Sequence, residues 1–333
     1  MITENNLEPI MVSIICLTYN QSKFIRDCLE GFVRQKTNFR FETIVHDDAS
    51  MDETPSVIRD YAQKFPDIIK PIIEEENQYS KHDGSLQRII NNELRGKYVA
   101  LCEGDDYWID PLKLQKQVDF LENNPEYGMC YTDFDIKNEV TGIYEHSLFK
   151  NEKSRYPSNY NLGEWIIKAG YVAPMTWVLK RELWLNLPII GSPDGTYVRF
   201  ASYLHDTHVY CLPDVTAVYR ILGESASHTS NLKQDYIRFK SMFKTKIQLA
   251  DLYLVGEEKQ NVVSVIKNEY YNRGLKLFIS FDDLDEIRNA RTCIDNKSLH
   301  HNFLFLVSHT KLTRRIIRYI YYLYRYFIYL SRK

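Results

Sequence analysis

The sequence predicts an α/β protein in which a mixed, mainly parallel sheet is flanked by helices and followed by an α-helical C-terminal region. The first observation is a set of four short apolar runs that are nearly continuous rather than alternating, as in strands buried on both faces of a parallel sheet. They occupy residues 12–17, 42–45, 68–73 and 98–102. The second observation is that helical patterns separate these runs, which indicates successive βαβ units. The third is that only helical patterns follow residue 231.

The helical segments each carry a start signal and one apolar face. Ser22 is expected to cap a helix whose apolar residues recur at i, i+3, i+4, i+7 and i+8 from Ile25. The pairs Thr54-Pro55 and Asp110-Pro111 each predict an N-cap followed by a proline at the first helical position. In the middle of the chain, strands are expected over residues 129–134, 175–179, 208–212 and 215–219, and helices over 164–169 and 195–205.

The expected division of the chain is linear, with an α/β domain over residues 1–230, a helical region over 231–310 and a basic, aromatic amphipathic helix over 311–333. The 42 Lys and Arg nearly balance the 44 Asp and Glu, which argues against a dedicated nucleic-acid binder. No uncharged apolar stretch is long enough to span a membrane, and the N-terminus lacks the apolar run of a secretory signal. The six scattered cysteines form no CxxC pair, which favours a reduced, cytoplasmic protein.

Polar residues follow the predicted strands at the edge where ligands of open parallel sheets bind. The first strand ends in Thr18-Tyr19-Asn20, the second in His46-Asp47-Asp48 and the fourth in Glu103-Gly104-Asp105-Asp106. Neighbouring carboxylates repel unless a cation or a hydrogen-bonding ligand lies between them, and hard oxygen ligands suit Mg²⁺ or Mn²⁺ shared with phosphates. Asp47, Asp48 and Asp52 have an alternative role as turn and cap residues. Because no glycine-rich phosphate loop is present, a nucleotide would be held by carboxylates, a metal and backbone groups.

Three segments resemble the family 2 glycosyltransferases of the GT-A fold, of the bacterial surface-glycan type. The run Val12-Ser13-Ile14-Ile15-Cys16-Leu17-Thr18-Tyr19-Asn20 resembles the family's opening, and Val45-His46-Asp47-Asp48-Ala49-Ser50-Met51-Asp52 resembles its second-strand motif. The segment Gly96-Lys97-Tyr98-Val99-Ala100-Leu101-Cys102-Glu103-Gly104-Asp105-Asp106-Tyr107-Trp108 resembles the family's fourth strand and D-x-D metal site, and a weaker match continues to Tyr219-Arg220. The sequence departs from the pattern at His46, Glu103 and Leu222, where relatives more often have Asp, Asp and His.

The resemblance implies a GT-A domain over residues 1–230 and roles for single residues. The residues implied in binding the donor nucleotide are Thr18, Tyr19, Asn20, Asp48, Arg88, Glu103 and Asp106. Asp105 would coordinate Mn²⁺ or Mg²⁺ at the diphosphate, and His228 is a second candidate ligand in place of Leu222. An exposed helix arginine and a surface-loop histidine are the alternative interpretations of Arg88 and His228.

An inverting transfer needs a base that removes the proton of the acceptor hydroxyl. The family places this aspartate before a helix downstream of the D-x-D site, and Asp194 matches by position, with Asp206 as its rival. Asp194 could instead be a helix N-cap. Trp108 and Trp177 are candidates for the sugar or acceptor site, with core packing as an equal alternative.

The C-terminal segment, residues 311–333, contains seven basic residues and no acid. On a helical projection at about 100° per residue, cations and apolar residues form opposite stripes. The cations are Lys311, Arg314, Arg318, Arg325 and Arg332, and the apolar residues are Leu312, Ile316, Ile320, Leu323, Phe327 and Leu330. This pattern is typical of a helix lying in a membrane interface, with packing on the protein or in a dimer as the alternative.

The sequence thus predicts a metal-dependent, inverting glycosyltransferase that uses a nucleotide-diphosphate-sugar donor, with a UDP-sugar expected. Its acceptor would be a hydroxyl of a lipid-linked or surface glycan, and it would act from the cytoplasm at the inner face of the membrane. One alternative is a non-catalytic sugar-nucleotide-binding module. The other is a sugar nucleotidyltransferase, which would need a Gly-rich, Arg-containing loop after the first strand, and residues 17–21 lack one. The oligomeric state stays open.

Overall fold

The structure, a computed structural model, describes residues 8–151, 160–168, 172–188, 190–223, 231–294 and 297–331. The chain forms two compact units that interleave in sequence rather than following each other. Unit 1 comprises Met1–Tyr160, Gly170–Pro188 and Ser202–Leu222, and unit 2 comprises Asn161–Ala169, Ile189–Ala201 and Gly223–Lys333. Two short segments that precede the boundary expected near Ser230 therefore group with the C-terminal helices. They are Asn161–Ala169 and Ile189–Ala201.

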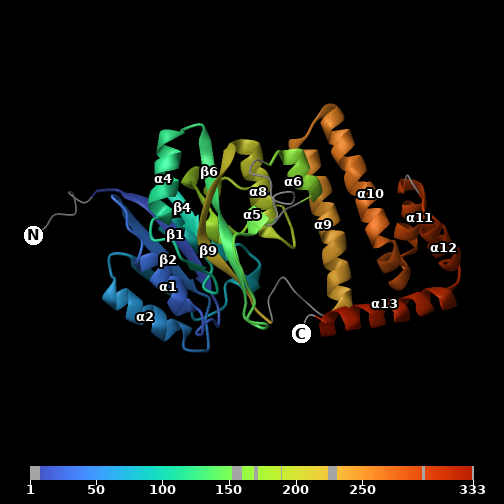
Figure 1. Cartoon of the computed structure of the whole chain (residues 1–333), viewed down its shortest axis with the longest axis horizontal. Coiled ribbons are helices and arrows are strands. Elements are labelled where there is room, and N and C mark those ends of the chain that lie inside the picture. The colour runs from blue at the N-terminus through green and yellow to red at the C-terminus, as the bar shows by residue number, and fades with distance from the viewer. Residues whose placement is uncertain are drawn as a thin grey trace, which may run out of the picture. The chain divides into compact units, whose positions relative to one another are not determined.

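Unit 1 is built on one nine-stranded mixed sheet (Figure 1) with the strand order β3-β2-β1-β4-β8-β6-β9-β5, and β7 paired to β6. The strands are β1 (Ile10–Thr18), β2 (Arg40–Asp47), β3 (Ile69–Ile73), β4 (Tyr98–Leu101), β5 (Tyr107–Trp108), β6 (Tyr127–Asn138), β7 (Tyr144–Glu145), β8 (Val178–Lys180) and β9 (His208–Ile221). Strands β3, β2, β1 and β4 run parallel, so their carboxyl ends meet at one edge. The α/β fold predicted from the sequence is confirmed.

Several details differ from the sequence-based expectation. Thr54 and Asp110 do not cap the helices that follow them, because the helices Thr54–Lys64 and Lys113–Asn123 begin without a side-chain cap bond. The strand expected at 175–179 covers only Val178–Lys180. The strands expected at 208–212 and 215–219 are one strand, β9, and its pairing with β6 shifts register opposite Thr132 and Asp133. This shift accommodates Pro213, which lacks an amide proton for the ladder. Ser22 does not cap the first helix, which begins at Ile25 without a side-chain cap. The backbone amide of Ser22 instead donates to Asp52 Oδ2 at 3.0 Å.

The helices of unit 1 pack around the sheet (Figure 1). They are α1 (Ile25–Val33), α2 (Thr54–Lys64), α3 (Ser85–Glu93), α4 (Lys113–Asn123), α5 (Leu148–Asn151) and α7 (Arg181–Leu185), with 3₁₀ turns η2 (Tyr79–Lys81) and η3 (Pro174–Thr176). The apolar face predicted for α1 is buried, including Ile25, Cys28, Leu29 and Phe32. Helix α8 (Gly195–Asp206) contributes residues to both units.

Unit 2 is helical in all of its described segments. Its remaining helices are α6 (Leu162–Lys168), α9 (Leu232–Tyr253), α10 (Gly256–Ser280), α11 (Leu284–Cys293), α12 (Leu299–Val307) and α13 (Lys311–Ser331). Its core combines aromatic side chains of α9 and α10 with apolar residues of α11 and α12, and Phe243 stacks on Tyr270 with ring centroids 3.8 Å apart. None of the helices in the described ranges combines the length and the apolar character that a membrane crossing requires.

Candidate functional site

The end of strand β1 and the loop after β4 meet closely in unit 1. The amide of Gly104 donates to the carbonyl oxygen of Leu17 at 2.9 Å. A Cβ atom at position 104 would lie 2.5 Å from Gln21 Oε1 and 2.8 Å from Thr18 Oγ1, so only glycine fits without displacing its neighbours. Thr18 Oγ1, Gln21 Oε1 and Asp105 Oδ1 are all buried without a hydrogen-bond partner. Buried polar atoms are nearly always paired, so three unpaired oxygens on adjoining segments point to a ligand site.

The loop after β4 concentrates negative charge. Desolvation by the surrounding protein, and then the charge of Asp105, raise the pKa of Glu103 to about 7, although the residue is exposed to solvent. Burial also raises the pKa of Asp105, against the lowering effects of Arg220 and Gln21. Asp106 is 5% exposed, and burial followed by the charge of Asp105 raises its pKa well above the usual range. The charged form of each carboxylate is therefore less favourable here than in water, and a bound cation would offset this cost.

Arg220, near the end of β9, holds this loop through hydrogen bonds to Asp105 and Asp106. Its backbone amide donates to Asp106 Oδ1 and its Nη1 donates to the Asp105 carbonyl oxygen, both at 2.8 Å. Its side chain is 2% exposed, with Nε donating to Glu139 at 2.9 Å and Nη2 donating to Asp27. The guanidinium lies 4.1 Å from the ring centroid of Tyr107. Arg220 thus fixes the main chain of the acidic loop without bonding to the carboxylate of Asp105.

This role of Arg220 was not predicted from the sequence, where the residue is only the end of a weaker match. A usable signal was present, because an arginine directly after the apolar run 215–219 is expected to be buried and therefore to need carboxylate or carbonyl partners. Which partners it finds depends on the antiparallel pairing of β5 with β9, which no motif specifies.

The two aspartates of the second-strand motif already accept hydrogen bonds from the protein. Asp47 accepts from the Ser50 amide at 3.1 Å and from its hydroxyl, which is a turn role. Asp48 is 6% exposed, and its two carboxylate oxygens accept from the amides of Gln78 at 2.6 Å and Tyr79 at 3.1 Å. Asp48 therefore fixes the 3₁₀ turn η2 and keeps only its remaining lone pairs for a ligand. Its amide donates to the Thr18 carbonyl oxygen at 3.0 Å, which joins this motif to the end of β1.

The neighbouring turns are tied together in the same way. Asn20, at a positive φ of 53°, donates from its amide to Ser50 Oγ and accepts from the Met51 amide, each at 2.8 Å. Burial opposes ionisation of Asp52, but hydrogen bonds from Thr54 and Ser22 lower its pKa to about 2. Asp52 therefore has a turn role but does not cap α2, whose N-cap residue is Glu53. Tyr19 is 49% exposed beside these turns.

The residues at this edge fit a hard divalent cation. Asp105 Oδ1 is an unpaired carboxylate oxygen, and hydroxyl and amide oxygens of Thr18 and Gln21 adjoin the same loop. Within the part of the chain that the structure describes, no three His, Cys, Asp or Glu side chains converge into a complete metal site. Mg²⁺ and Mn²⁺ sites often use one or two carboxylates and complete their shell with substrate phosphates, so the donor set suits a shared ion.

Other predicted site residues lie away from this cluster or outside the described chain. Arg88 has a side chain that is 66% exposed and donates to the Asp83 carbonyl oxygen at 2.8 Å, without a described contact to the acidic loop. Asp194 lies in unit 2, where its Oδ1 accepts from the Tyr197 amide at 3.0 Å at the start of α8. Asp206 ends that helix in unit 1 and contacts His205 at 2.7 Å. His228 lies outside the described residues.

The two tryptophans expected at the sugar or acceptor site lie in the core of unit 1. Trp108 is 4% exposed, donates to the Met175 carbonyl oxygen at 2.8 Å and packs edge-on against Phe32. Trp177 is fully buried and contacts Tyr203. This placement favours the core-packing alternative for both, because neither indole ring is open to a ligand.

Comparison with known proteins identifies relatives of this chain. The family model "Glycosyl transferase family 2" matches residues 13–185. An uncharacterised protein of Mycobacterium tuberculosis is 31% identical over 264 residues, which cover 77% of this chain and 72% of that protein. The Escherichia coli enzyme WfaP, a UDP-Glc:α-D-GlcNAc-diphosphoundecaprenol β-1,3-glucosyltransferase, is 29% identical over 136 residues, 40% of this chain and 51% of the enzyme.

Solved structures show the same fold. TarS from S. aureus, in complex with UDP-GlcNAc, aligns with a TM-score of 0.62 over 94% of this chain and 91% of that chain, at 18% identity. The mannosyltransferase PcManGT from Pyrobaculum calidifontis, in complex with GDP-Man and Mn²⁺, aligns with a TM-score of 0.53 at 16% identity, over 96% of this chain and 88% of that chain.

Proposed function

The chain belongs to glycosyl transferase family 2, and on that premise we propose that it transfers a sugar from a UDP-sugar to a hydroxyl of a lipid-linked or surface glycan, with inversion at the anomeric carbon. The observation that carries the proposal is the group of three unpaired buried oxygens on Thr18, Gln21 and Asp105, next to the acidic loop. A UDP-sugar is preferred because WfaP uses UDP-Glc and TarS was crystallised with UDP-GlcNAc.

Asp105 is the proposed ligand of Mn²⁺ or Mg²⁺, and Mn²⁺ accompanies GDP-Man in PcManGT. When bound, such an ion supplies positive charge at the leaving diphosphate. The proposed nucleotide contacts are the hydroxyl of Thr18, the ring of Tyr19 and the carboxylates of Asp48 and Glu103. Asn20 and Asp106 bind other parts of the protein in the structure, so their proposed contribution is to position the loops around the nucleotide.

The transfer step needs a proton acceptor opposite the leaving group. The acceptor oxygen forms a bond to the anomeric carbon as the bond from that carbon to the diphosphate oxygen breaks, and the hydroxyl proton passes to a carboxylate. We propose Asp194 as this base, because it lies at the start of α8, where its Oδ1 accepts from the Tyr197 amide, and the residue is partly exposed. Asp206 is the alternative, and its contact with His205 leaves it 38% exposed.

The donor is tested by thermal-shift titration with a panel of nucleotide-diphosphate sugars, with and without Mn²⁺. We expect one donor to raise the melting temperature in a metal-dependent way and Asp105→Asn to abolish the metal dependence. Asp60→Asn, on the exposed face of α2, is the matched control and should behave like the wild type. A folded protein that responds to no donor in the presence of metal would refute the proposed donor site.

The base is tested by comparing Asp194→Asn with Asp206→Asn. Loss of transfer with donor binding retained in Asp194→Asn, and activity retained in Asp206→Asn, is the expected pattern. The reverse pattern would make Asp206 the base. If donor binding persists and neither substitution changes any measured transfer to a glycan or glycolipid acceptor, the chain is a sugar-nucleotide-binding module without this chemistry.

We also propose that the protein works at the inner surface of the membrane, on the cytoplasmic side, where a lipid-linked acceptor would be available. The support is the composition of residues 311–333, with seven basic residues and no acid, together with the lipid-linked acceptor in the name of WfaP. The α13 helix is too polar to cross a bilayer, so the contact would be peripheral.

A further inference from the structure

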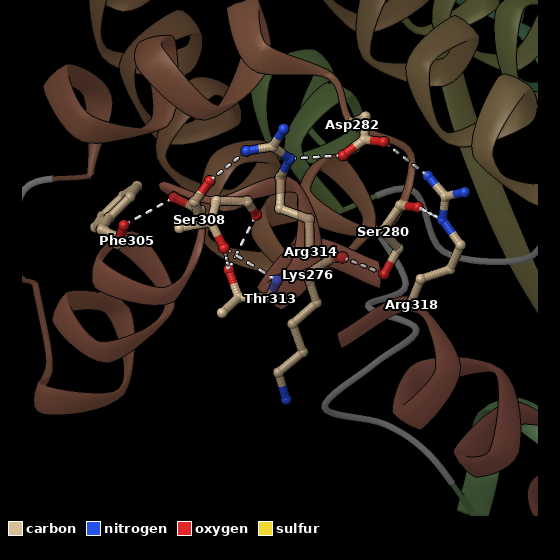
Figure 2. Close-up of polar contacts among 9 residues, drawn as sticks. Lys276, Ser280, Asp282, Phe305, Ser308, Thr313, Arg314 and Arg318 are labelled. Carbon is tan, nitrogen blue, oxygen red and sulfur yellow. Dashed lines mark hydrogen bonds and ion pairs between the residues drawn. The ribbon is translucent and has the colours of Figure 1, made fainter. Parts of the chain in front are cut away.

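The C-terminal helix α13 is attached to the end of α10 by two arginines (Figure 2). Arg314 donates from Nε to Asp282 Oδ1 at 2.6 Å and from Nη1 to the Ser308 carbonyl oxygen at 2.7 Å. Arg318 Nη2 lies 3.3 Å from Asp282 Oδ2, and its Nε donates to the carbonyl oxygen of Ser280. The last carbonyl groups of a helix lack intrahelical partners and carry partial negative charge, so the end of α10 is a suitable anchor for these cations.

The carboxylate at the centre of this anchor is itself fixed by the backbone. Asp282 has a φ of 56°, in the left-handed region, in the turn that follows α10. The amide of Asp282 donates to the Ile279 carbonyl oxygen at 3.3 Å, and that of Asp283 donates to the Phe278 carbonyl oxygen at 2.9 Å. These bonds terminate α10 in a defined geometry. The orientation of α13 about its own axis is therefore determined by a rigid partner.

The anchor turns one face of α13 toward unit 2 and leaves the opposite face uncovered. Ile317 packs against the aromatic core of the unit. Leu312 is 69% exposed, Ile316 51%, Tyr319 66% and Ile320 59%. Four large apolar side chains on two successive turns of one helix form a patch, which on a monomer's surface usually marks an interaction site.

The uncovered face also carries positive charge. Lys311 and Arg315 are exposed, and at about 100° per residue they fall within the same arc of about 140° as Leu312, Ile316 and Tyr319. The sequence of α13 contains no acidic residue.

Elsewhere in unit 2, the basic residues Arg291, Lys297 and His309 line a hollow of about 420 Å³ next to Leu306, and no carboxylate is among its described lining residues.

We propose that this face of α13 docks on the surface of a bilayer that contains anionic phospholipids. Leu312, Ile316, Tyr319 and Ile320 would enter the boundary between headgroups and acyl chains, while Lys311 and Arg315 bind headgroup phosphates. Arg314 and Arg318 do not serve as lipid ligands in this arrangement, because they hold the helix on unit 2. The proposal deepens the proposed function by naming the surface at which a lipid-linked acceptor would be met.

This assignment revises the pattern read from the sequence, which grouped Arg314 and Arg318 with the lipid-facing cations. The structure directs both toward Asp282 and the end of α10. The side chains of Leu323, Arg325, Phe327, Leu330 and Arg332 lie outside the described part of the chain.

A bilayer fits the face better than a second copy of this chain. In a pairing of α13 with itself, Lys311 and Arg315 would find no acid on the facing helix, because the sequence of α13 contains none. An anionic interface accommodates both the apolar side chains and the cations.

The test is co-flotation of the full chain with vesicles of phosphatidylcholine, alone or with about 30% phosphatidylglycerol as the anionic lipid. We expect the wild type to bind the mixed vesicles and the Leu312→Glu, Ile316→Glu double variant to bind at least about tenfold more weakly. Leu252→Glu, at a residue of α9 that is 55% exposed, is the matched control and should retain binding. All three positions are exposed, so the variants should melt like the wild type.

Two arginines of the same helix give the sharper comparison. Arg315→Gln should lower binding to the mixed vesicles about fivefold, whereas Arg318→Gln should change it less than about twofold. Equal losses would overturn the assignment of the two side chains. The docking proposal also fails if the double variant binds vesicles like the wild type, or if the wild type binds neither kind of vesicle.

Light scattering tests whether a second copy of the chain occupies this face instead of a bilayer. A wild-type dimer that is lost in the double variant would identify a second copy as the occupant. Donor thermal shifts are recorded on the same variants. Loss of vesicle binding with an intact donor shift separates α13 from the donor site. Failure of the donor shift in every variant would refute the proposed function and leave the vesicle result standing.

Discussion

Replacing Arg220 by alanine should destabilise unit 1, because this β9 side chain holds the acidic loop in place. The side chain makes three hydrogen bonds, to Asp27, Glu139 and the Asp105 carbonyl oxygen, and hydrogen bonds of charged groups contribute roughly 1.5–3 kcal/mol each. Asp27 is 58% exposed and Glu139 25%, so water can partly replace the arginine at both. We therefore expect a loss of about 3 kcal/mol, at the lower end of the range for breaking a buried pair.

This loss would lower the melting temperature of a unit of this size by about 6–12 °C. Three of the four tryptophans, at positions 108, 177 and 184, belong to unit 1, so urea unfolding followed by tryptophan fluorescence reports mainly on it. Arg34→Ala is the control, because Arg34 is 73% exposed and its pair with Glu30 should contribute less than about 0.5 kcal/mol. An Arg220→Ala protein that unfolds within about 0.5 kcal/mol of the wild type would refute the reasoning.

Three further predictions concern the same unit. Gly104→Ala would place a Cβ atom 2.8 Å from Thr18 Oγ1, so calorimetry should show donor affinity reduced at least about tenfold; unchanged affinity would contradict the close approach. Because the pKa of Glu103 is raised from 4.5 to about 7, the native state binds the extra proton and stability should fall as the pH rises between these values; in urea titrations Glu103→Gln should lack this fall. Burial lowers the pKa of Lys113 from 10.5 to about 7, so stability should rise over that pH range, and Lys113→Met should lack the rise.

The sheet and the location of the site could be predicted because they depend on local patterns. Continuous apolar runs separated by amphipathic segments specify parallel strands, and the carboxyl ends of such strands share one edge. The structure accordingly brings Thr18, Asp48 and the Glu103–Asp106 loop to neighbouring strands β1, β2 and β4. The tie between the Asp48 amide and the Thr18 carbonyl oxygen follows directly from this strand order.

The features that the sequence did not reveal depend on contacts between distant segments. Asp48 and Tyr79 are 31 residues apart in the sequence, and Arg220 and Asp106 are 114 residues apart. Neither hydrogen bond can therefore be predicted from a local sequence pattern. The grouping of residues 161–169 with the C-terminal helices has the same origin, since Lys246 of α9 donates to the Ile167 carbonyl oxygen at 2.6 Å. A helical projection separated the faces of α13 but could not identify which face would meet Asp282.

The way in which Arg220 is used explains how the acidic loop can be both ordered and available to a ligand. A guanidinium bonded to the carboxylate of Asp105 would offset the repulsion between the acids, but it would also occupy the oxygens that a cation needs. Arg220 instead binds the main-chain oxygen of Asp105 and the carboxylates of Asp27 and Glu139. Burial therefore keeps the pKa of Asp105 raised, and its Oδ1 stays unpaired. Such an arrangement lowers stability at the site, and a bound cation with its phosphates would return part of that stability, which is why the donor should stabilise the protein only with metal present.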